Sequence, residues 1–184
     1  NGKTSVADLF YQILKNNNFP VATIGTLGIK YKGKIIKSKL TSPDTVTLHA
    51  ALEKIKKEKI DNVLIEASSH GLHQKRIDHL NIKAGIFTNF SQDHLDYHKT
   101  IQHYLNSKLK LFRNILQTDK SVILDRSINE FPTFKKILKK KKLKLIDISR
   151  IKKKLENNAH LNFSDFQLKN LAMAISASKL CNLK

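Results

Sequence analysis

Short apolar segments alternate with amphipathic segments along most of this 184-residue chain, and no other feature restricts its fold as strongly. The apolar segments have the length and composition of buried strands, and they are residues 21–24, 62–67, 84–89, 121–125 and 143–148. Apolar residues recur at helical spacing between or beside them, over residues 4–16, 45–57, 100–116, 129–140 and 166–180. This alternation predicts an α/β fold with a doubly wound, mostly parallel sheet. Residues 29–39 depart from it, because Lys32 and Gly33 predict a hairpin turn.

Ligands bind at the carboxyl ends of the strands in such sheets, so the loops there are the first places to search for chemistry. A further candidate is Gly2-Lys3-Thr4-Ser5, which opens the first predicted helix. A phosphate-binding loop ends in G-K-[ST], where backbone N–H groups hold phosphate, the lysine reaches the outer phosphates and the hydroxyl binds Mg²⁺. The first glycine of such a loop would lie before Asn1. These four residues alone are weak evidence, and the alternative interpretation is an ordinary capped helix start.

Two predicted strands end in residues suited to metal chemistry. Glu66 follows one strand, and a carboxylate beside a phosphate loop is a ligand for hydrated Mg²⁺. The loop after the next strand contains Asp93, His94, Asp96 and His98. This density of Asp and His is also found in metal hydrolases. The alternative is a polar loop with one or two helix-capping residues.

Two longer strings of residues are more specific than the single positions above. Residues 68–76 contain S-S-H-G-L-x-Q-x-R, and residues 88–98 contain T-N-x-S-x-D-H-L-D-Y-H. Both strings resemble the Mur ligases, in the branch that adds the third amino acid to UDP-N-acetylmuramoyl-L-alanyl-D-glutamate. Shorter strings of the same family stand in the same order at residues 25–28, 41–44 and 104–112, and the resemblance returns at residues 166–172.

The resemblance implies a P-loop-type central domain over residues 1–184 that begins within the phosphate loop. A UDP-binding domain would precede it and an amino-acid-binding domain would follow it. The implied activity is ATP-dependent amide formation through an acyl phosphate in peptidoglycan synthesis, with ATP and Mg²⁺ as cofactors. The implied substrates are UDP-N-acetylmuramoyl-L-alanyl-D-glutamate and a diamino acid, meso-diaminopimelate rather than lysine. The family further implies a cytoplasmic monomer, and we expect this segment alone to have no ligase turnover.

The resemblance also assigns roles to individual residues. Catalysis is assigned to Lys3, Glu66, His94 and Lys108. Metal binding is assigned to Thr4, Glu66, His94 and Lys108, the last as a carbamylated lysine. ATP contacts are assigned to Asn1, Gly2, Lys3, Thr4, Ser5, Asn89 and Asn170, with Gln167 beside the last. Substrate contacts are assigned to Thr41, Ser42, Ser68, Gln74 and Arg76, of which Arg76 has the fork that grips a carboxylate or phosphate.

Some positions depart from the family pattern. Ser42 stands where the family has threonine, and Ser164 stands where it usually has glycine. Residues 124–126 read Leu-Asp-Arg in place of the usual N-x-D-D, and the region from 125 to 165 is short. These differences concern mainly the last third of the chain.

Parts of the sequence are also compatible with other classes of protein. The net charge of +19 is typical of nucleic-acid-binding modules, but only four of the 34 basic residues are arginine, and arginine supplies the forks that such modules use. We therefore expect no nucleic-acid partner. A folylpolyglutamate synthase-like ligase and a metal hydrolase using His94, Asp96 and His98 are the other candidates. We predict no membrane association, because no run of about 18 apolar residues is present, and the single cysteine excludes an internal disulfide.

Overall fold

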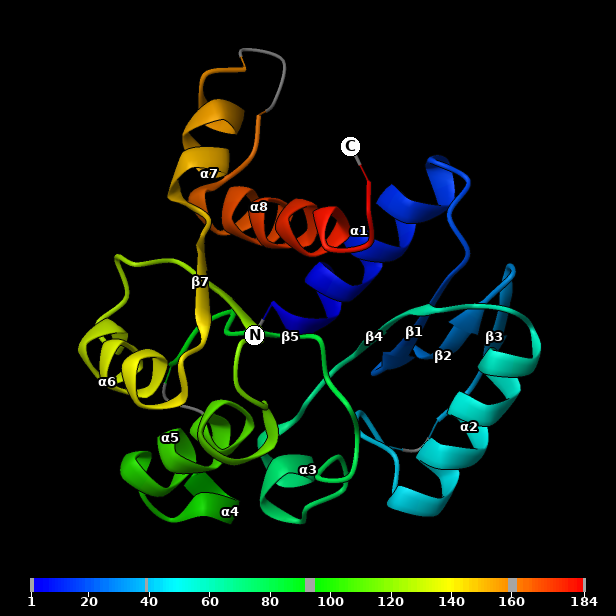
Figure 1. Ribbon diagram of the computed structural model, residues 1–184, viewed down its shortest axis with the longest axis horizontal. Helices are drawn as coiled ribbons and strands as arrows, with labels where there is room; N and C mark the ends of the chain where they lie inside the picture. The colour runs from blue at the N-terminus through cyan, green and yellow to red at the C-terminus, as the bar shows by residue number, and fades with distance from the viewer. Residues whose placement is uncertain (1, 39, 92–94, 159–161, 184) are drawn as a thin grey trace.

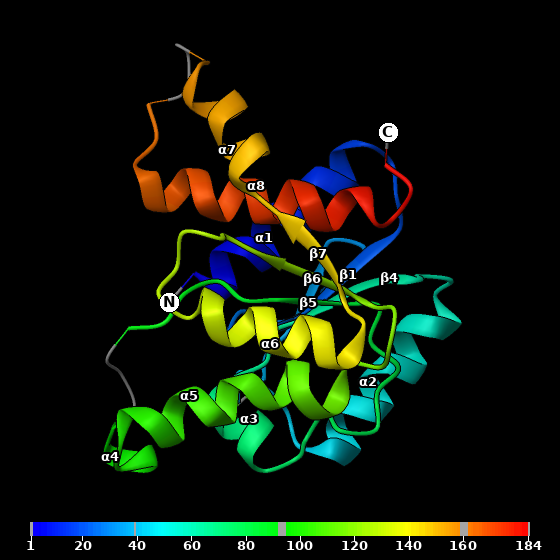
Figure 2. The same cartoon turned by 60° about the vertical axis from the view of Figure 1, so that its left-hand side comes forward.

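The strands form two sheets that lie side by side between two layers of helices (Figure 1). This computed structural model describes residues 2–38, 40–91, 95–158 and 162–183. One face of the strands is covered by α1 (Lys3–Asn16), α7 (Ser149–Glu156) and α8 (Asp165–Lys179) (Figure 2). The other face is covered by α2 (Thr45–Lys57), α3 (Ser69–His73), α5 (Ile101–Lys110) and α6 (Phe131–Lys141). The predicted α/β class is therefore confirmed.

The first sheet has the strand order β3-β2-β1-β4. Its strands are β1 (Val21–Gly25), β2 (Gly28–Tyr31), β3 (Lys34–Ile36) and β4 (Asn62–Ile65). Strand β1 is parallel to β4 and antiparallel to β2, which in turn is antiparallel to β3. Lys32 and Gly33 form the hairpin turn with φ angles of 46° and 75°, as the left-handed positions of a two-residue turn require.

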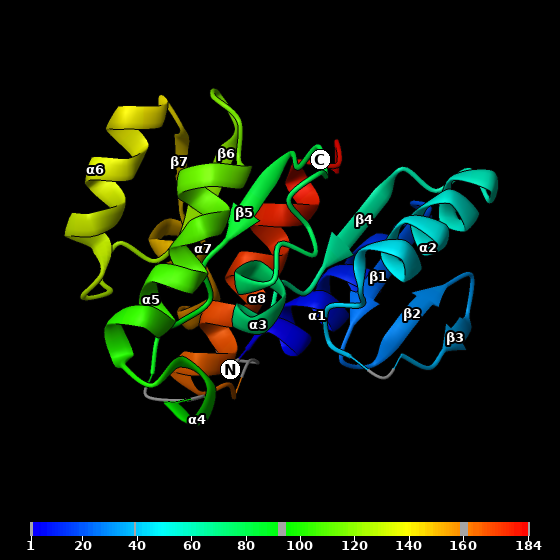
Figure 3. The same ribbon diagram turned by 90° about the horizontal axis from the view of Figure 1, so that it is seen from below.

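The second sheet is parallel, with the order β5-β6-β7. Its strands are β5 (Ala84–Ile86), β6 (Ser121–Leu124) and β7 (Lys144–Asp147). The sequence pattern predicted one doubly wound sheet, whereas in the structure β4 and β5 are edge strands of separate sheets (Figure 3). The two sheets lie side by side, and together they are mostly parallel.

The longer helices follow the predicted periodicity closely. They are α1 (Lys3–Asn16), α2 (Thr45–Lys57), α5 (Ile101–Lys110), α6 (Phe131–Lys141) and α8 (Asp165–Lys179). Helix α2 begins where Asp44 accepts a hydrogen bond from the Thr47 amide at 3.0 Å, which is the usual role of an N-cap residue. The predicted helix over 100–116 is divided, because α5 continues as the π-helical segment η1 (Leu111–Ile115).

Three short helices were not predicted. They are α3 (Ser69–His73), α4 (Leu95–His98) and α7 (Ser149–Glu156). Helix α7 lies in the region that the sequence left unassigned, and none of its residues is buried. Helix α8 begins at Ser164, whose hydroxyl caps the Gln167 amide while the Gln167 side chain accepts from Ser164 N–H at 2.8 Å. This capping box explains a serine at this position.

Two apolar cores stabilise the layers. One lies between the strands and helices α2, α5 and α6, and Phe87, Phe112 and Phe134 are at most 2% exposed there. Their ring centroids lie 4.8 to 6.1 Å apart, the spacing of edge-to-face aromatic pairs. The other core packs α1 against α8 around residues such as Leu14 and Met173. Among the described residues, no helix has the length and apolar character needed to cross a bilayer.

Candidate functional site

The start of α1 has the geometry of an anion-binding helix terminus. Gly2 has a φ of 89°, a left-handed value that favours glycine. A Cβ atom there would lie 2.8 Å from Asn170 Oδ1, so glycine is also required by space. Gly2 offers no side-chain cap to the first turn, so the first N–H groups of the helix remain available to a ligand.

Glu66 is fixed beside this helix start. It directly follows β4 and is only 3% exposed. Its Oε2 accepts a hydrogen bond from Thr4 Oγ1 at 2.9 Å, and its Oε1 accepts from the Thr26 amide at 3.0 Å. Thr26 Oγ1 also donates to Oε2 at 3.2 Å. The structure therefore brings together Thr4 and Glu66, which the sequence predicted as metal ligands, although 62 residues separate them.

Gly25 makes room for this carboxylate. A Cβ atom at position 25 would lie 2.0 Å from Glu66 Oε1, so no larger residue fits without moving Glu66. Thr26, which the site prediction omitted, holds Glu66 and also lies 3.1 Å from the Thr41 hydroxyl. The glycine–threonine string at residues 25–28 was the sequence signal for this contact, but it gave no role to Thr26.

The predicted substrate residues form a connected group on the other side of Glu66. Ser42 is 1% exposed, and its hydroxyl lies 2.8 Å from the Glu66 carbonyl oxygen and accepts from the Ser68 amide at 2.9 Å. Ser68 caps α3 by accepting from the Gly71 amide at 3.0 Å. Arg76 donates to the Ser42 carbonyl oxygen at 2.6 Å and to the side chain of Gln74. Thr41 lies beside this group, with its hydroxyl 3.1 Å from that of Thr26, which binds Glu66.

Lys108 lies on α5, facing the loop after β5. Its Nζ donates to the Asn89 carbonyl oxygen at 2.6 Å, with Tyr104 Oη at 3.4 Å. The rings of Phe87, Phe90 and Tyr104 have their centroids 5.0 to 5.6 Å from Nζ. The ammonium group is thus held between aromatic rings and the loop that leads toward residues 92–94.

Part of the predicted site lies outside the described residues. His94 and Asp93 belong to residues 92–94, and Asn1 is likewise not described. His98 is described and is 5% exposed, with its ring packed 5.3 Å from that of Tyr104. Within the described chain, no group of three His, Cys, Asp or Glu side chains is placed to hold a metal ion. The alternative hydrolase cluster of His94, Asp96 and His98 therefore lies partly outside the described residues.

The other residues predicted to contact ATP differ in their exposure and in their surroundings. Ser5 is exposed on the first turn of α1. Asn170 is 3% exposed and lies against Gly2, so α8 contributes to the same corner as the helix start. Gln167 is engaged in the capping box of α8. Phe166 is 44% exposed and also lies close to Gly2.

Comparison with known proteins agrees with this geometry. The chain is 44% identical to a UDP-N-acetylmuramoyl-L-alanyl-D-glutamate–2,6-diaminopimelate ligase of Bradyrhizobium diazoefficiens over 115 residues, which are 62% of this chain and 24% of that protein. The identity is 40% over 148 residues to the ligase of the same name from Zymomonas mobilis, covering 80% of this chain and 30% of that protein. This chain therefore spans less than a third of the length of these relatives.

A solved structure and a family match complete the comparison. A UDP-N-acetylmuramoyl-L-alanyl-D-glutamate–2,6-diaminopimelate ligase superimposes with a TM-score of 0.80 at 22% identity, covering 100% of this chain and 42% of that chain. At this identity the likeness concerns the fold. The family described as the Mur ligase middle domain matches residues 1–180. Since that match covers nearly the whole chain, the protein belongs to the Mur ligase family, through its middle domain.

Proposed function

We propose that this chain is the ATP-binding part of a cytoplasmic, ATP-dependent ligase that adds a diamino acid to UDP-N-acetylmuramoyl-L-alanyl-D-glutamate. The observation that carries the proposal is the buried Glu66 carboxylate, bonded to Thr4 at the uncapped start of α1. A helix start with a lysine and a hydroxyl beside a fixed carboxylate suits a nucleotide phosphate chain and its cation. The names of the relatives supply the substrate class.

The residues at the helix start fit a Mg²⁺ site. Thr4 and Glu66 provide only oxygen donors, which is the ligand type that Mg²⁺ prefers. Three hydrogen bonds from Thr4 and Thr26 hold the Glu66 carboxylate in one orientation. A bound Mg²⁺ would neutralise charge on the phosphates during phosphoryl transfer. Lys3, at the first position of α1, would reach the outer phosphates.

The reaction proceeds in two steps that the chain can position. The carboxylate of the UDP-linked substrate attacks the γ-phosphorus of ATP, which breaks the bond to ADP and forms an acyl phosphate. The amine of the diamino acid then attacks the acyl carbon, phosphate leaves with the C–O bond electrons, and the amine loses a proton. Holding the reactants in line is the main contribution of the protein to such a transfer. Arg76, with Thr41, Ser42, Ser68 and Gln74, would hold the acidic substrate.

Lys108 and His94 complete the proposal. Reaction of an uncharged Lys108 amine with CO₂ forms an N–C bond, releases one proton and yields a carbamate anion. That anion would supply the oxygen ligands for a second Mg²⁺ near His94. The support is the position of Lys108 Nζ, 2.6 Å from the Asn89 carbonyl oxygen at the start of the loop that contains His94. By the same resemblance, Asn89 and Asn170 lie along the bound ATP.

The test is ADP release by the full-length protein. The assay holds ATP, Mg²⁺ and UDP-N-acetylmuramoyl-L-alanyl-D-glutamate constant and offers meso-diaminopimelate or L-lysine in turn. We expect release that depends on the amino acid and is greater with diaminopimelate. Lys108→Ala should lower it at least about 100-fold, as loss of a group that organises transition-state charge does, and added formate should restore part of it.

Lys110→Ala is the matched control, because Lys110 lies on the same helix. Its Nζ makes a long contact of 3.5 Å with the His73 carbonyl oxygen. This variant should keep its activity. Release that is independent of any amino acid, or that needs a folate in place of the muramoyl substrate, would contradict the proposal.

A further inference from the structure

The hydroxyl of Tyr97 lies between two side chains at the end of α3, although the sequence gave Tyr97 no role of its own. Tyr97 belongs to α4, the short helix that follows residues 92–94. Its Oη lies 3.0 Å from His73 Nδ1 and accepts a hydrogen bond from Gln74 Nε2 at 3.2 Å. A side chain three residues after His94 is thus bonded to Gln74, one of the residues predicted to contact the substrate.

Neighbouring rings hold the Tyr97 side chain in this position. Its ring centroid lies 4.0 Å from that of His70, with the planes tilted by 41°, and 4.8 Å from that of His98 at 86°. Contacts of this kind between rings are attractive, so they restrict the rotation of the tyrosine ring. Figure 1 shows α3, α4 and α5 gathered at one side of the molecule, and α5 packs against both of the others. Helix packing and ring contacts together therefore set the place of the Tyr97 hydroxyl.

The Gln74 amide connects Tyr97 to Arg76. Its Nε2 donates to Tyr97 Oη, and its Oε1 accepts from Arg76 Nη2. A guanidinium group has only N–H donors, so the reversed amide would place a donor against a donor. Because the Tyr97 hydroxyl accepts from Nε2, it stabilises the one amide orientation that Arg76 requires.

Arg76 is held through its side chain and its backbone. Its Nη1 donates to the Ser42 carbonyl oxygen at 2.6 Å, and its Nη2 donates to Gln74. Its amide donates to the Gly71 carbonyl oxygen at 2.9 Å, and Lys75 ends α3 with a left-handed φ of 57°, as in a Schellman turn. Within the described chain, the side-chain bonds use two of the five N–H donors of the guanidinium group. The fork is therefore fixed in direction and still has donors for an acidic ligand.

The same short helix also contacts the surroundings of Lys108. The ring of His98, the residue after Tyr97, lies 5.3 Å from the ring of Tyr104. The Tyr104 hydroxyl in turn lies 3.4 Å from Lys108 Nζ. Helix α4 thus connects the group of predicted substrate residues on one side with Lys108 on the other.

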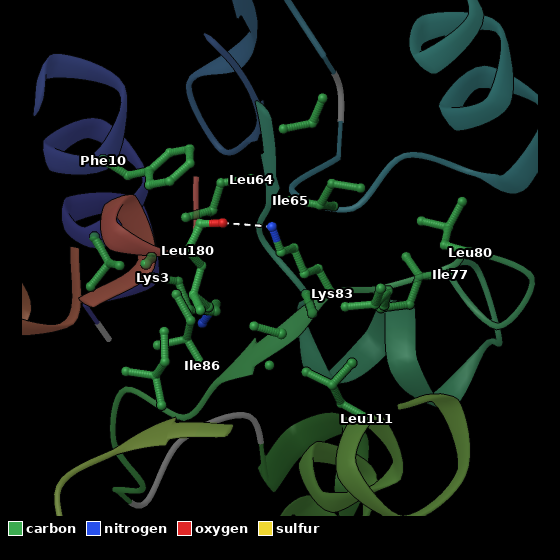
Figure 4. Close-up of a pocket in the computed structure, with 18 of the residues that line it drawn as sticks. Lys3, Phe10, Leu64, Ile65, Ile77, Leu80, Lys83, Ile86, Leu111 and Leu180 are labelled. Atoms are coloured by element: carbon green, nitrogen blue, oxygen red, sulfur yellow. Dashed lines mark hydrogen bonds between the residues drawn. The ribbon is translucent and has the colours of Figure 1, made fainter. Parts of the chain in front are cut away.

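This chain of contacts is separate from a large apolar cavity between β4 and β5. The cavity has a volume of about 700 Å³, and Lys3 and Lys83 are among the lining residues that Figure 4 shows. Neither Tyr97 nor Arg76 lines it. An acidic ligand of Arg76 would therefore bind outside that cavity, beside Ser42.

We infer that Tyr97 is a positioning residue of the substrate site. Its hydroxyl fixes the Gln74 amide, and this amide fixes the Arg76 fork for a carboxylate or phosphate of UDP-N-acetylmuramoyl-L-alanyl-D-glutamate. The inference rests on the proposed function, from which it takes this substrate. A fork that is already held in one direction loses less conformational entropy on binding, so the hydroxyl should contribute to substrate affinity rather than to the chemical step.

The substitution Tyr97→Phe in the full-length protein tests the inference, because it keeps the ring and removes only the hydroxyl. Calorimetric titration with UDP-N-acetylmuramoyl-L-alanyl-D-glutamate in the absence of ATP measures the affinity, and ADP release measures the kinetic constants. We expect the Kd and the KM for this substrate to rise roughly 10-fold, as for loss of a hydrogen bond that supports a charged group. The kcat and the KM for ATP should change little. A purely structural defect would lower the active fraction, and hence kcat, without raising that KM.

Two further variants make the test specific. Gln74→Ala should weaken binding at least as much, and adding Tyr97→Phe to it should have no further effect, because the two side chains act in one chain of contacts. Tyr11→Phe is the matched control, since it also removes a tyrosine hydroxyl, which in this case accepts from the Gly33 amide at 3.3 Å. This control should leave the affinity for the substrate unchanged.

Three results would overturn the inference and leave the proposed function intact. They are an unchanged affinity in Tyr97→Phe, effects of Tyr97→Phe and Gln74→Ala that simply add, and a loss confined to kcat. Each of them is read against wild type that binds the substrate and releases ADP. Wild type that does not bind the muramoyl substrate would contradict both the inference and the proposed function.

Discussion

At the residue scale, the candidate site depends on a few positions, such as Gly25, where no further side-chain atom fits without moving a neighbour. The motif strings predicted Thr4 and Glu66, and the structure places their side chains 2.9 Å apart. Thr26 was missed, because a threonine in a short string gives no indication that its amide and hydroxyl both bind a carboxylate. Gly25 was recognised as part of a string, but its physical reason, the Glu66 carboxylate against its Cα, is visible only in three dimensions.

The substitution Gly25→Ala tests whether the Glu66 carboxylate needs the space that a Cβ atom at position 25 would fill. The new Cβ would lie 2.0 Å from Glu66 Oε1, so the carboxylate must move. We expect a loss of unfolding free energy of about 1–3 kcal/mol, as for other overpacked positions, together with weaker Mg²⁺-dependent nucleotide binding. Urea denaturation and calorimetric titration of the full-length protein measure the two effects. Gly33→Ala is the control: its Cβ meets nothing within 4 Å, so its left-handed strain should lower stability alone.

The Ser42 hydroxyl provides a second residue-scale test. It is buried, accepts from the Ser68 amide and contacts the Glu66 carbonyl oxygen. Ser42→Ala leaves that amide without this partner, which we expect to cost about 1–3 kcal/mol of unfolding free energy. Ser42→Thr keeps the hydroxyl and should retain most of the stability. Equal destabilisation by the two substitutions in urea melts would show that the hydroxyl is not the cause.

At the element scale, periodicity predicted the long helices and the strands but not the contacts that organise the short ones. Helix α2 was predicted with its observed ends, since Asp44 caps it. Helix α7 has no fully buried residue, and its apolar contacts with the core between α1 and α8 come from Ile151 and Leu155, two apolar residues in a polar segment. A charge pair also attaches it, because Lys152, which contacts Glu156 of the same helix at 3.0 Å, contacts Asp165 of α8 at 2.5 Å.

This attachment should depend on pH. Hydrogen bonds from Lys152 and then Lys169 hold the pKa of Asp165 below its usual value. A carboxyl with a lowered folded-state pKa stabilises the fold above its unfolded pKa of about 3.9, and this contribution is lost as the pH falls through the folded value. Below about pH 4 the stability of wild type should therefore decrease. Lys169→Met should lessen this decrease, whereas Lys153→Met, on the exposed side of α7, should not. Parallel pH profiles of the denaturation midpoint for both variants would contradict the assignment.

At the scale of the whole molecule, the fold class was predictable and the division of the sheet was not. Alternating segments predict a doubly wound arrangement, and both helix layers are present (Figure 2). Which strands pair is decided by tertiary contacts that no local pattern encodes.

We propose that the start of α1 and Glu66 form a site for a nucleotide with its cation. Calorimetric titration of the full-length protein with ADP, with and without Mg²⁺, tests this most directly when wild type is compared with Thr4→Val. That change keeps the side-chain shape but removes the hydroxyl that lies 2.9 Å from Glu66. We expect Mg²⁺ to raise the affinity for ADP in wild type and in the control Thr133→Val, and we expect this gain to be largely lost in Thr4→Val. An undiminished Mg²⁺ effect in Thr4→Val would contradict it.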